Sequence, residues 1–400
     1  MKKAILLSTP HMSGKEQDYI QEAFDTNWIS PLGANVTEFE RKIKEYTGAS
    51  AVCATSSGTA AIHLALRLLE VGRGDTVFCS SFTFIASASP IKYLGADVTF
   101  IDSEPETWNM SPQALERALA DAKKEHHLPK AVIIVHLYGQ SAQMDELVTI
   151  CQFYGVPIIE DAAESMGSTY KGQQSGTFGD FGIYSFNGNK IITTSGGGAL
   201  VAKDPEMIEK AVFLATQAKE EAPHYQHETV GYNYRMSNIL AGIGRAQMEV
   251  LDNRIAARQN NFRFYADQWK HIQEIEMMPE LPNSVSNHWL SAITLDSEKT
   301  GMTPYDVMDK MQELGIETRV LWKPLHSQPV FATMPFYEHI QGEEAVCEKL
   351  FHEGLCLPSG SNLTQTELDY VSKALETILK NNHGSVVQHA IAKARVMESF

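Results

Sequence analysis

Residues 51–69, AVCATSSGTAAIHLALRLL, predict a strand, a tight turn and a helix in direct succession. The strand covers Ala51–Thr55, and the small residues Ser56–Thr59 form the turn. Backbone N–H groups at such a turn point outward at the positive end of the helix dipole, where phosphate groups bind. N-capping by serine or threonine explains the same residues without a ligand. The turn matches neither the P-loop nor the GxGxxG pattern, so this segment alone leaves both interpretations open.

Strands and helices continue to alternate after this unit. The predicted strands are Thr76–Cys79, Asp97–Asp102, Ala131–His136 and Val156–Asp161. Apolar strands separated by helices predict βαβ units, and therefore an α/β fold with a mostly parallel sheet. Ligands of such sheets bind at the carboxyl ends of the strands. We therefore expect Asp161, Ser56–Thr59 and Phe82, which follow three of the strands, to face one crevice.

A second informative stretch is residues 179–198, GDFGIYSFNGNKIITTSGGG. It places Lys190 on a turn between a β-rich run, Phe181–Phe186, and three glycines, Gly196–Gly198. The neighbours of Lys190 in the sequence are apolar or neutral, which favours a neutral amine able to attack a carbonyl carbon. A surface lysine beside a glycine-rich turn has the same pattern, so the stretch alone does not decide its role.

Length and composition favour a globular enzyme with more than one domain. The chain has 400 residues, of which 43% are hydrophobic and 20% charged. We expect a large domain at 1–271, a small C-terminal α+β domain at 272–383 and a tail at 384–400. The net charge of −16 and the lack of a basic stripe argue against nucleic acid as a partner.

Cysteine usage and the apolar runs bear on the cellular compartment. The five cysteines are scattered without a CxxC pair, so the sequence predicts neither a disulfide framework nor a metal site. The N-terminal apolar run is too short for a signal peptide, and no run of the sequence approaches a membrane-spanning length. We therefore expect a cytoplasmic protein with reduced cysteines and no membrane partner.

Four of these features together indicate one cofactor, pyridoxal 5'-phosphate. This cofactor needs a lysine that bonds its aldehyde, a carboxylate that protonates its ring nitrogen, a phosphate site and a planar side chain against its ring. Lys190, Asp161, Ser56–Thr59 and Phe82 supply these groups in that order. A generic α/β protein without the cofactor would have to combine these features by coincidence.

The order of motifs resembles the DegT/StrS-type nucleotide-sugar aminotransferases, also called the DegT/DnrJ/EryC type. The motifs are SSGT at 56–59, EDAAES at 160–165, SFNGNKIITTSGGG at 185–198, GYNYRMS at 231–237 and PLHSQP at 324–329. The resemblance runs from the first residues to about residue 380. It implies the aspartate-aminotransferase fold (fold type I), with a large mostly parallel-sheet domain and a smaller C-terminal α+β domain.

The resemblance also implies roles for individual residues. Lys190 matches the lysine that forms the Schiff base and acts as the catalytic residue, and Asp161 matches the partner of the ring nitrogen. The other implied cofactor-binding residues are Phe82 over the ring, Ser57, Gly58, Thr59 and Ser185 at the phosphate, and Glu164 near the ring oxygen. Asn233 matches an asparagine that reaches the phosphate of the neighbouring subunit, which implies a homodimer with shared active sites. The segments that contact the sugar nucleotide in relatives contain Trp28, Asn187, Arg235, Trp322, Lys323 and His326.

The implied activity is a two-stage transfer of an amino group. An amino acid, taken as L-glutamate, gives its amine to the cofactor, and a nucleotide-linked 4-keto-6-deoxy sugar receives it. UDP-4-keto-6-deoxy-N-acetylglucosamine, for exopolysaccharide or other glycan biosynthesis, is the expected sugar. Family members that dehydrate sugars have histidine in place of Lys190, so the lysine favours transamination. Another fold-type-I enzyme acting on amino acids and a non-catalytic cofactor-binding regulator remain as alternatives.

Overall fold

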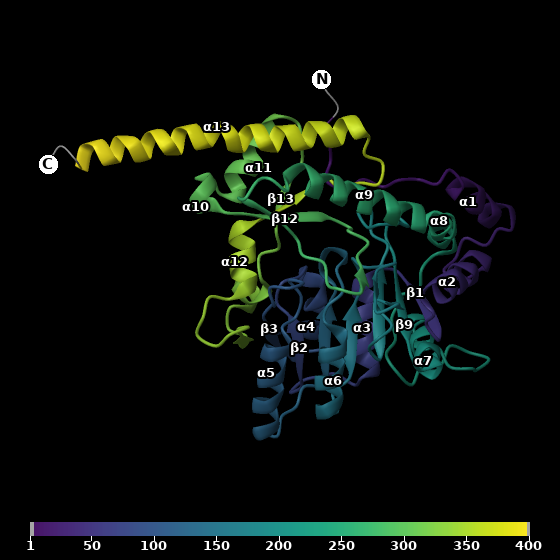
Figure 1. Ribbon diagram of the computed structural model, residues 1–400. Helices are drawn as coiled ribbons and strands as arrows, with labels where there is room; N and C mark the ends of the chain where they lie inside the picture. The colour runs from purple at the N-terminus through teal and green to yellow at the C-terminus, as the bar shows by residue number, and fades with distance from the viewer. Residues whose placement is uncertain (1–3, 398–400) are drawn as a thin grey trace.

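Two sheets and a long C-terminal helix dominate the molecule (Figure 1). The computed structural model describes residues 4–397, with side chains through residue 382. The larger sheet has eight strands in the order β1-β9-β8-β5-β4-β2-β3-β14. All pairs from β8 to β14 are parallel, whereas β9 pairs antiparallel with both β8 and β1. The mostly parallel sheet predicted from the alternation of strands and helices is confirmed.

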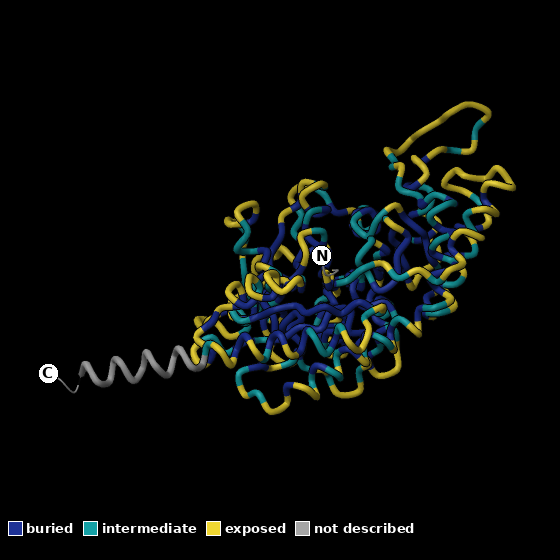
Figure 2. The backbone as a smooth tube through the Cα atoms, turned by 90° about the horizontal axis from the view of Figure 1, so that it is seen from above, coloured by how far each residue is buried: buried dark blue, intermediate teal, exposed yellow. Residues whose placement is uncertain are grey.

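The bounds of the larger sheet follow the predicted runs closely. Its strands are β1 (Ala51–Thr55), β2 (Thr76–Ser80), β3 (Asp97–Ile101), β4 (Ala131–Val135), β5 (Ile158–Asp161), β8 (Phe181–Ser185), β9 (Gly198–Ala202) and β14 (Phe336–Tyr337). Every residue of β4 and β9 is buried, as expected for strands inside a sheet whose two faces are both covered by helices. Figure 2 shows this buried backbone as the dark blue centre of the molecule, with exposed segments at the periphery.

The helices that accompany this sheet begin and end at residues with clear local signals. They are α1 (Glu16–Asp25), α2 (Ala34–Thr47), α3 (Gly58–Leu68), α4 (Ser89–Tyr93), α5 (Pro112–Lys124), α6 (Met144–Tyr154), α7 (Pro205–Ala215), α8 (Asn238–Met248) and α9 (Leu251–Trp269). The side chains of Ser57, Ser111 and Asp204 cap α3, α5 and α7. Gly48 ends α2 with a φ of 74°, a left-handed conformation that favours glycine.

The sequence from about Asn238 to Lys270 favours one continuous helix, whereas the structure has two helices there, α8 and α9. They are separated at Glu249 and Val250, where the backbone of Val250 leaves the helical region. The Glu249 carboxylate accepts hydrogen bonds from Lys15 Nζ at 3.0 Å and Tyr19 Oη at 2.5 Å. These contacts with the N-terminal segment accompany a break that helix periodicity did not predict.

The second sheet has four antiparallel strands, in the order β10-β12-β15-β13. Its strands are β10 (Ile275–Met277), β12 (Ser291–Leu295), β15 (Gly354–Leu357) and β13 (Arg319–Val320), and the helices of this region are α10 (Ser297–Thr300), α11 (Pro304–Glu313), α12 (Val346–Glu353) and α13 (Gln365–Met397). A separate small sheet joins β11 (Ser284–Val285), β6 (Thr169–Tyr170) and β7 (Gln173–Gln174). The predicted tail, 384–400, lies outside the described side chains.

Two segments cross the domain division predicted at residue 271. Strand β14 comes from the predicted small domain but pairs with β3 of the larger sheet. Ile5, near the N-terminus, forms a β-bridge with Ile316 and packs in the core of the second sheet. These two connections tie the predicted halves together. The division at residue 271 stays a prediction.

None of the helices in the described part of the chain combines the length and the apolar character that a membrane span requires. The five cysteines are all buried and free, and burial raises the pKa of Cys53 to about 11. These thiols are therefore protonated near neutral pH and pack as small apolar side chains.

Candidate active site

A cavity of about 370 Å³ opens where several strands of the larger sheet end. This volume is typical of a small-molecule site. The cavity brings together many of the residues singled out in the sequence: Ser57, Gly58, Thr59, Asp161, Glu164, Ser185, Asn187, Lys190 and Trp322. A smaller cavity of about 70 Å³ adjoins it and shares Asn189, Trp289, Arg319 and Trp322.

The start of helix α3 forms one wall of this cavity. Ser57 Oγ accepts a hydrogen bond from Ala60 N at 3.0 Å, which leaves the N–H groups of Gly58 and Thr59 in the uncovered first turn. Strand β9 passes so close to this turn that a Cβ on Gly198 would lie 2.4 Å from Gly58 N. A Cβ on Gly58 would lie 3.3 Å from Ser185 Cβ. Glycines thus permit a narrow cradle of N–H groups and serine hydroxyls, the arrangement that binds phosphate.

Asp161 ends β5 and lies in the cavity with its carboxylate held in place. Asp161 Oδ2 accepts from Ser87 Oγ at 2.6 Å, and Oδ1 accepts from Ala163 N at 3.1 Å. Thr83 Oγ1 lies 3.1 Å from Ser87 Oγ and extends this network. The side chain is only 6% exposed. A buried, oriented carboxylate of this kind can hold a proton on a ring nitrogen opposite it.

Lys190 faces a carboxylate and an indole ring across the cavity. Its Nζ lies 3.5 Å from Glu164 Oε1 and 4.0 Å from the centroid of the Trp289 ring. The neutral surroundings inferred from its sequence neighbours are therefore wrong, because the fold brings an acidic residue against it. Glu164 Oε2 accepts from Tyr138 N at 2.8 Å. Burial raises the pKa of Glu164, while Lys190 and the Tyr138 N–H act in the opposite direction.

The turn that carries Lys190 is fixed from the opposite side. The carbonyl oxygen of Asn189 accepts from Trp289 Nε1 at 2.8 Å and from Ser8 Oγ at 2.9 Å. Ser8 Oγ in turn accepts from Arg258 Nη2 at 2.9 Å. Burial lowers the pKa of Arg258 to about 9, with Arg254 adding to the effect. The N-terminal segment and α9 thus hold the backbone next to the lysine in place.

Phe82, expected to cover the cofactor ring, does not line this cavity. Its side chain is 2% exposed and belongs to the core. Phe84 lines the cavity instead, is 52% exposed, and faces the Trp322 ring at 5.5 Å. The reason is local: Thr83 N donates to Ser81 O at 3.1 Å, a tight turn that directs Phe82 inward. We therefore replace Phe82 by Phe84 as the candidate for ring contact.

Three of the predicted substrate residues lie outside the cavity lining. Arg235 Nη1 pairs with Glu40 Oε1 at 2.5 Å and also donates to Ala54 O at 3.1 Å. His326 lies between Ser81 Oγ, 2.7 Å away, and Glu348 Oε1, 3.1 Å away. Lys323 is exposed on the surface. In this chain Arg235 and His326 join segments of the fold, and none of the three reaches the cavity.

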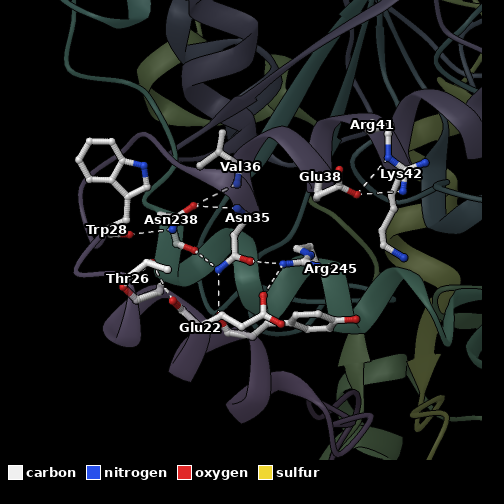
Figure 3. Close-up of polar contacts among 12 residues, drawn as sticks. Glu22, Thr26, Trp28, Asn35, Val36, Glu38, Arg41, Lys42, Asn238 and Arg245 are labelled. Carbon is white, nitrogen blue, oxygen red and sulfur yellow. Dashed lines mark hydrogen bonds and ion pairs between the residues drawn. The ribbon is translucent and has the colours of Figure 1, made fainter.

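Trp28 also lies outside the cavity, on a segment that polar contacts hold firmly (Figure 3). Asn238 Nδ2 donates to Trp28 O at 2.7 Å, while Asn238 Oδ1 accepts from Asn35 N at 2.9 Å and from Val36 N at 3.2 Å. One asparagine therefore caps α2 and fixes the chain at Trp28. The Trp28 ring points away from this cluster and is 50% exposed.

Asn233 is exposed and does not line the cavity of its own chain. It forms an antiparallel bridge with Thr216 at the base of a loop that projects beside α7 in Figure 1. Tyr225 and Val230 in this loop are 83% and 80% exposed. Large side chains with that exposure are unusual on a free surface when they gather on one segment.

The cavity also contains residues that the sequence did not single out: Phe84, Ser87, Asn189, Trp289 and Arg319. Ser87 had no signal in the sequence, since a serine seven residues beyond the end of β2 has no fixed partner. Trp289 lies just before β12 and Arg319 begins β13, so both come about a hundred residues or more after Lys190. Their approach to the cavity depends on how the second sheet docks, which local sequence patterns do not encode.

The residues present fit pyridoxal phosphate. The glycine-lined cradle at α3 suits the phosphate, the buried Asp161 carboxylate suits the ring nitrogen, and Lys190 supplies the amine. Phe84 offers a planar side chain in the same cavity. This set would hold the cofactor from both ends and place its aldehyde within reach of one amine.

Comparisons with known proteins agree with this cofactor. The family model described as the DegT/DnrJ/EryC1/StrS aminotransferase family matches residues 10–376. EpsN of Bacillus subtilis (strain 168), provisionally named a pyridoxal phosphate-dependent aminotransferase, is 60% identical over 94% of this chain and 96% of its own. A GDP-perosamine synthase of Caulobacter vibrioides is 35% identical over 94% and 98%. The crystal structure of a DegT DnrJ EryC1 StrS aminotransferase from Brucella abortus superposes with a TM-score of 0.84 at 29% identity, covering 91% of this chain and 95% of that one.

Proposed function

The chain belongs to the DegT/DnrJ/EryC1/StrS aminotransferase family, and on this premise we propose that it aminates a nucleotide-linked 4-keto-6-deoxy sugar, with L-glutamate as the donor. As a member it is a pyridoxal phosphate-dependent sugar aminotransferase. We propose UDP-4-keto-6-deoxy-N-acetylglucosamine as the sugar, and exopolysaccharide biosynthesis in the cytoplasm as the setting. The observation that carries the proposal is the shared cavity of Lys190, Asp161 and the α3 cradle.

When bound, pyridoxal phosphate supplies an aldehyde that takes up the amine and a ring that accepts the electron pair of a broken C–H bond. Asp161 keeps the ring nitrogen protonated, and Ser87 keeps the Asp161 carboxylate oriented. Lys190 Nζ takes the proton from the α carbon of the donor in the first half-reaction and delivers a proton to the sugar carbon in the second. The cradle at Ser57, Gly58 and Thr59 anchors the phosphate, which fixes the distance between this amine and the reacting carbon.

The function is tested by following the visible absorbance of the bound cofactor. We expect glutamate to convert its spectrum to that of the amine form, and a nucleotide-linked 4-keto-6-deoxy sugar to restore the first spectrum. A panel of keto sugars on UDP, GDP and dTDP then ranks the acceptors. A spectrum that glutamate leaves unchanged would point to a cofactor-binding regulator. If 2-keto acids restore the first spectrum and no nucleotide-linked sugar does, the protein is an amino-acid aminotransferase.

We further propose that two copies of the chain form the working enzyme, with Asn233 of one copy at the phosphate site of the other. The support is that Asn233 lies on a projecting loop, away from the cavity of its own chain. The same loop exposes Tyr225 and Val230, and the segment around Trp28 exposes Ile29 and Leu32 at 47% and 62%. A second copy would bury these side chains.

Mixing two inactive variants tests the shared site. Lys190→Ala removes the amine and Asn233→Ala removes the group that reaches the partner. In a mixed dimer one site contains Lys190 from one chain and Asn233 from the other. We expect the mixture to recover activity that neither variant has alone, after mild unfolding and refolding together. A mixture that stays inactive, although mass measurement finds mixed dimers, contradicts the proposal.

A further inference from the structure

Glu164 is anchored by one carboxylate oxygen and presents the other to Lys190. Oε2 accepts from Tyr138 N at 2.8 Å, and Oε1 lies 3.5 Å from Lys190 Nζ. The backbone is held as well, because Asn287 Nδ2 donates to Glu164 O at 3.0 Å. With 6% exposure the carboxylate has little access to water. Its charge therefore depends on the few groups around it.

The titratable groups that act on Glu164 are Lys190, Asp161, Tyr138 and Cys356. Burial raises the pKa of Cys356 to about 12 and raises that of the Tyr138 phenol as well, so both are neutral near pH 7. Asp161 adds a second negative charge, held by Ser87 and Ala163. Lys190 is thus the cation that balances Glu164 within this group.

Loading the cofactor removes that balance. The Lys190 amine forms the covalent bond to the cofactor aldehyde, which lies next to the ring oxygen of pyridoxal phosphate. When the nitrogen of this bond is protonated, the negative ring oxygen already balances it. An ionised Glu164 would then face another negative oxygen in a buried site, with the Lys190 nitrogen no longer free to balance it. Two such groups do not both stay ionised, since one of them takes up a proton.

We propose that Glu164 takes a proton from the Lys190 ammonium when the cofactor binds, keeps it, and donates a hydrogen bond to the ring oxygen as a neutral acid. The proposal rests on the roles given to Lys190 and the cofactor under the proposed function. The ammonium gives one proton to Glu164 Oε1 and becomes an amine. The amine nitrogen then bonds the aldehyde carbon, and its two remaining hydrogens leave with the aldehyde oxygen as water.

The two oxygens of Glu164 suit the two functions of a protonated carboxyl group. Oε2, which accepts the Tyr138 N–H, takes the place of the carbonyl oxygen, and Oε1 carries the hydrogen toward the ring. Glutamine can make the same pair of contacts, with its oxygen on Tyr138 N and its NH₂ group toward the ring. Glu164→Gln is therefore a matched replacement for the neutral acid and a poor one for the carboxylate.

Infrared difference spectroscopy of the loaded minus the unloaded enzyme tests this state directly. We expect the C=O band of a protonated carboxylic acid to appear on loading in the natural chain and to be missing in Glu164→Gln. An isotope label on the glutamate carboxyl carbons assigns the band without any variant. Burial raises the pKa of Glu104 to about 8. This acid is present in both states of the enzyme, so its contribution should cancel in the difference spectrum.

The pH titration of the cofactor absorbance gives a second measurement. We expect its pKa in Glu164→Gln to stay within about half a unit of the natural value, because one neutral donor replaces another. Loss of an ionised carboxylate would lower it by about 1–3 units. A shift of that size overturns the inference. So does an infrared spectrum in which cofactor binding produces no C=O band of a protonated carboxylic acid. If the natural chain forms no chromophore at all, the proposed function fails instead.

Discussion

Lys190→Ala is expected to lower kcat by at least about 10⁴-fold, because it removes both the amine that bonds the cofactor and the group that moves the proton. Lys190 supplies the amine in the cavity that also contains Asp161 and the α3 cradle. Arg319 is the other cation in the cavity lining, and its guanidinium stays protonated and cannot form the covalent bond. The loss should therefore be nearly complete.

Cofactor retention is the sharper measurement for this variant. After reduction with borohydride and dialysis, the natural chain should keep the reduced cofactor covalently attached, detected by its near-ultraviolet absorbance, and Lys190→Ala should lose it. Lys124→Ala serves as the matched control, since Lys124 pairs with Asp121 on the surface of α5. This control variant should retain the reduced cofactor after the same treatment and, without reduction, the full activity. Reduced cofactor that stays attached to Lys190→Ala would mean that another amine carries the cofactor.

Gly198→Ala should cause the largest loss of stability among single methyl additions in this site. The new Cβ would lie 2.4 Å from Gly58 N and 2.6 Å from Ser57 O, and both are backbone atoms that cannot turn aside. Relief requires β9 to move away from the start of α3, which disturbs the β1–β9 pairing and the cradle together. We expect a loss of about 3 kcal/mol in unfolding free energy. Cofactor affinity should also fall more than about tenfold.

Gly196→Ala is the control for this prediction, because no atom lies within 4 Å of its added Cβ. Both glycines belong to the same run and have φ values that other residues adopt. Denaturant unfolding of the two apo variants separates local crowding from a general effect of glycine replacement. Equal stability losses in the two variants would show that the close approach of β9 to α3 is not the cause.

The sequence predicted the scaffold well because its signals are local. The apolar strands, the serine N-cap of α3 and the glycine run each act within a few residues, and the structure has them where the pattern placed them. Asp161 and Lys190 meet in one cavity because parallel strands present their carboxyl ends at one edge of the sheet.

The remaining features depend on contacts distant in the sequence. Phe84 replaced Phe82 as the candidate for ring contact only once the turn at Ser81 was known. The pairing of Arg235 with Glu40 joins residues 195 positions apart. The neighbours of Lys190 in the chain are uncharged, yet Glu164 lies against its amine in space. Side chains that link segments and side chains that bind ligands are often of the same type, so composition alone does not separate them.

The parallel pairing of β14 with β3 limits how the two parts of the chain can move. Phe100 N donates to Pro335 O at 2.8 Å and Asp102 N donates to Tyr337 O at 3.0 Å. The Asp102 carboxylate also accepts from His339 N, Val346 N and Cys347 N, at 2.9 Å, 3.0 Å and 3.0 Å. A hinge motion that swung the second sheet away as a rigid body would break this set of bonds at once. Ligand entry without such a rupture leaves the motion to loops and rings at the mouth of the site, where Phe84 and Trp322 face each other.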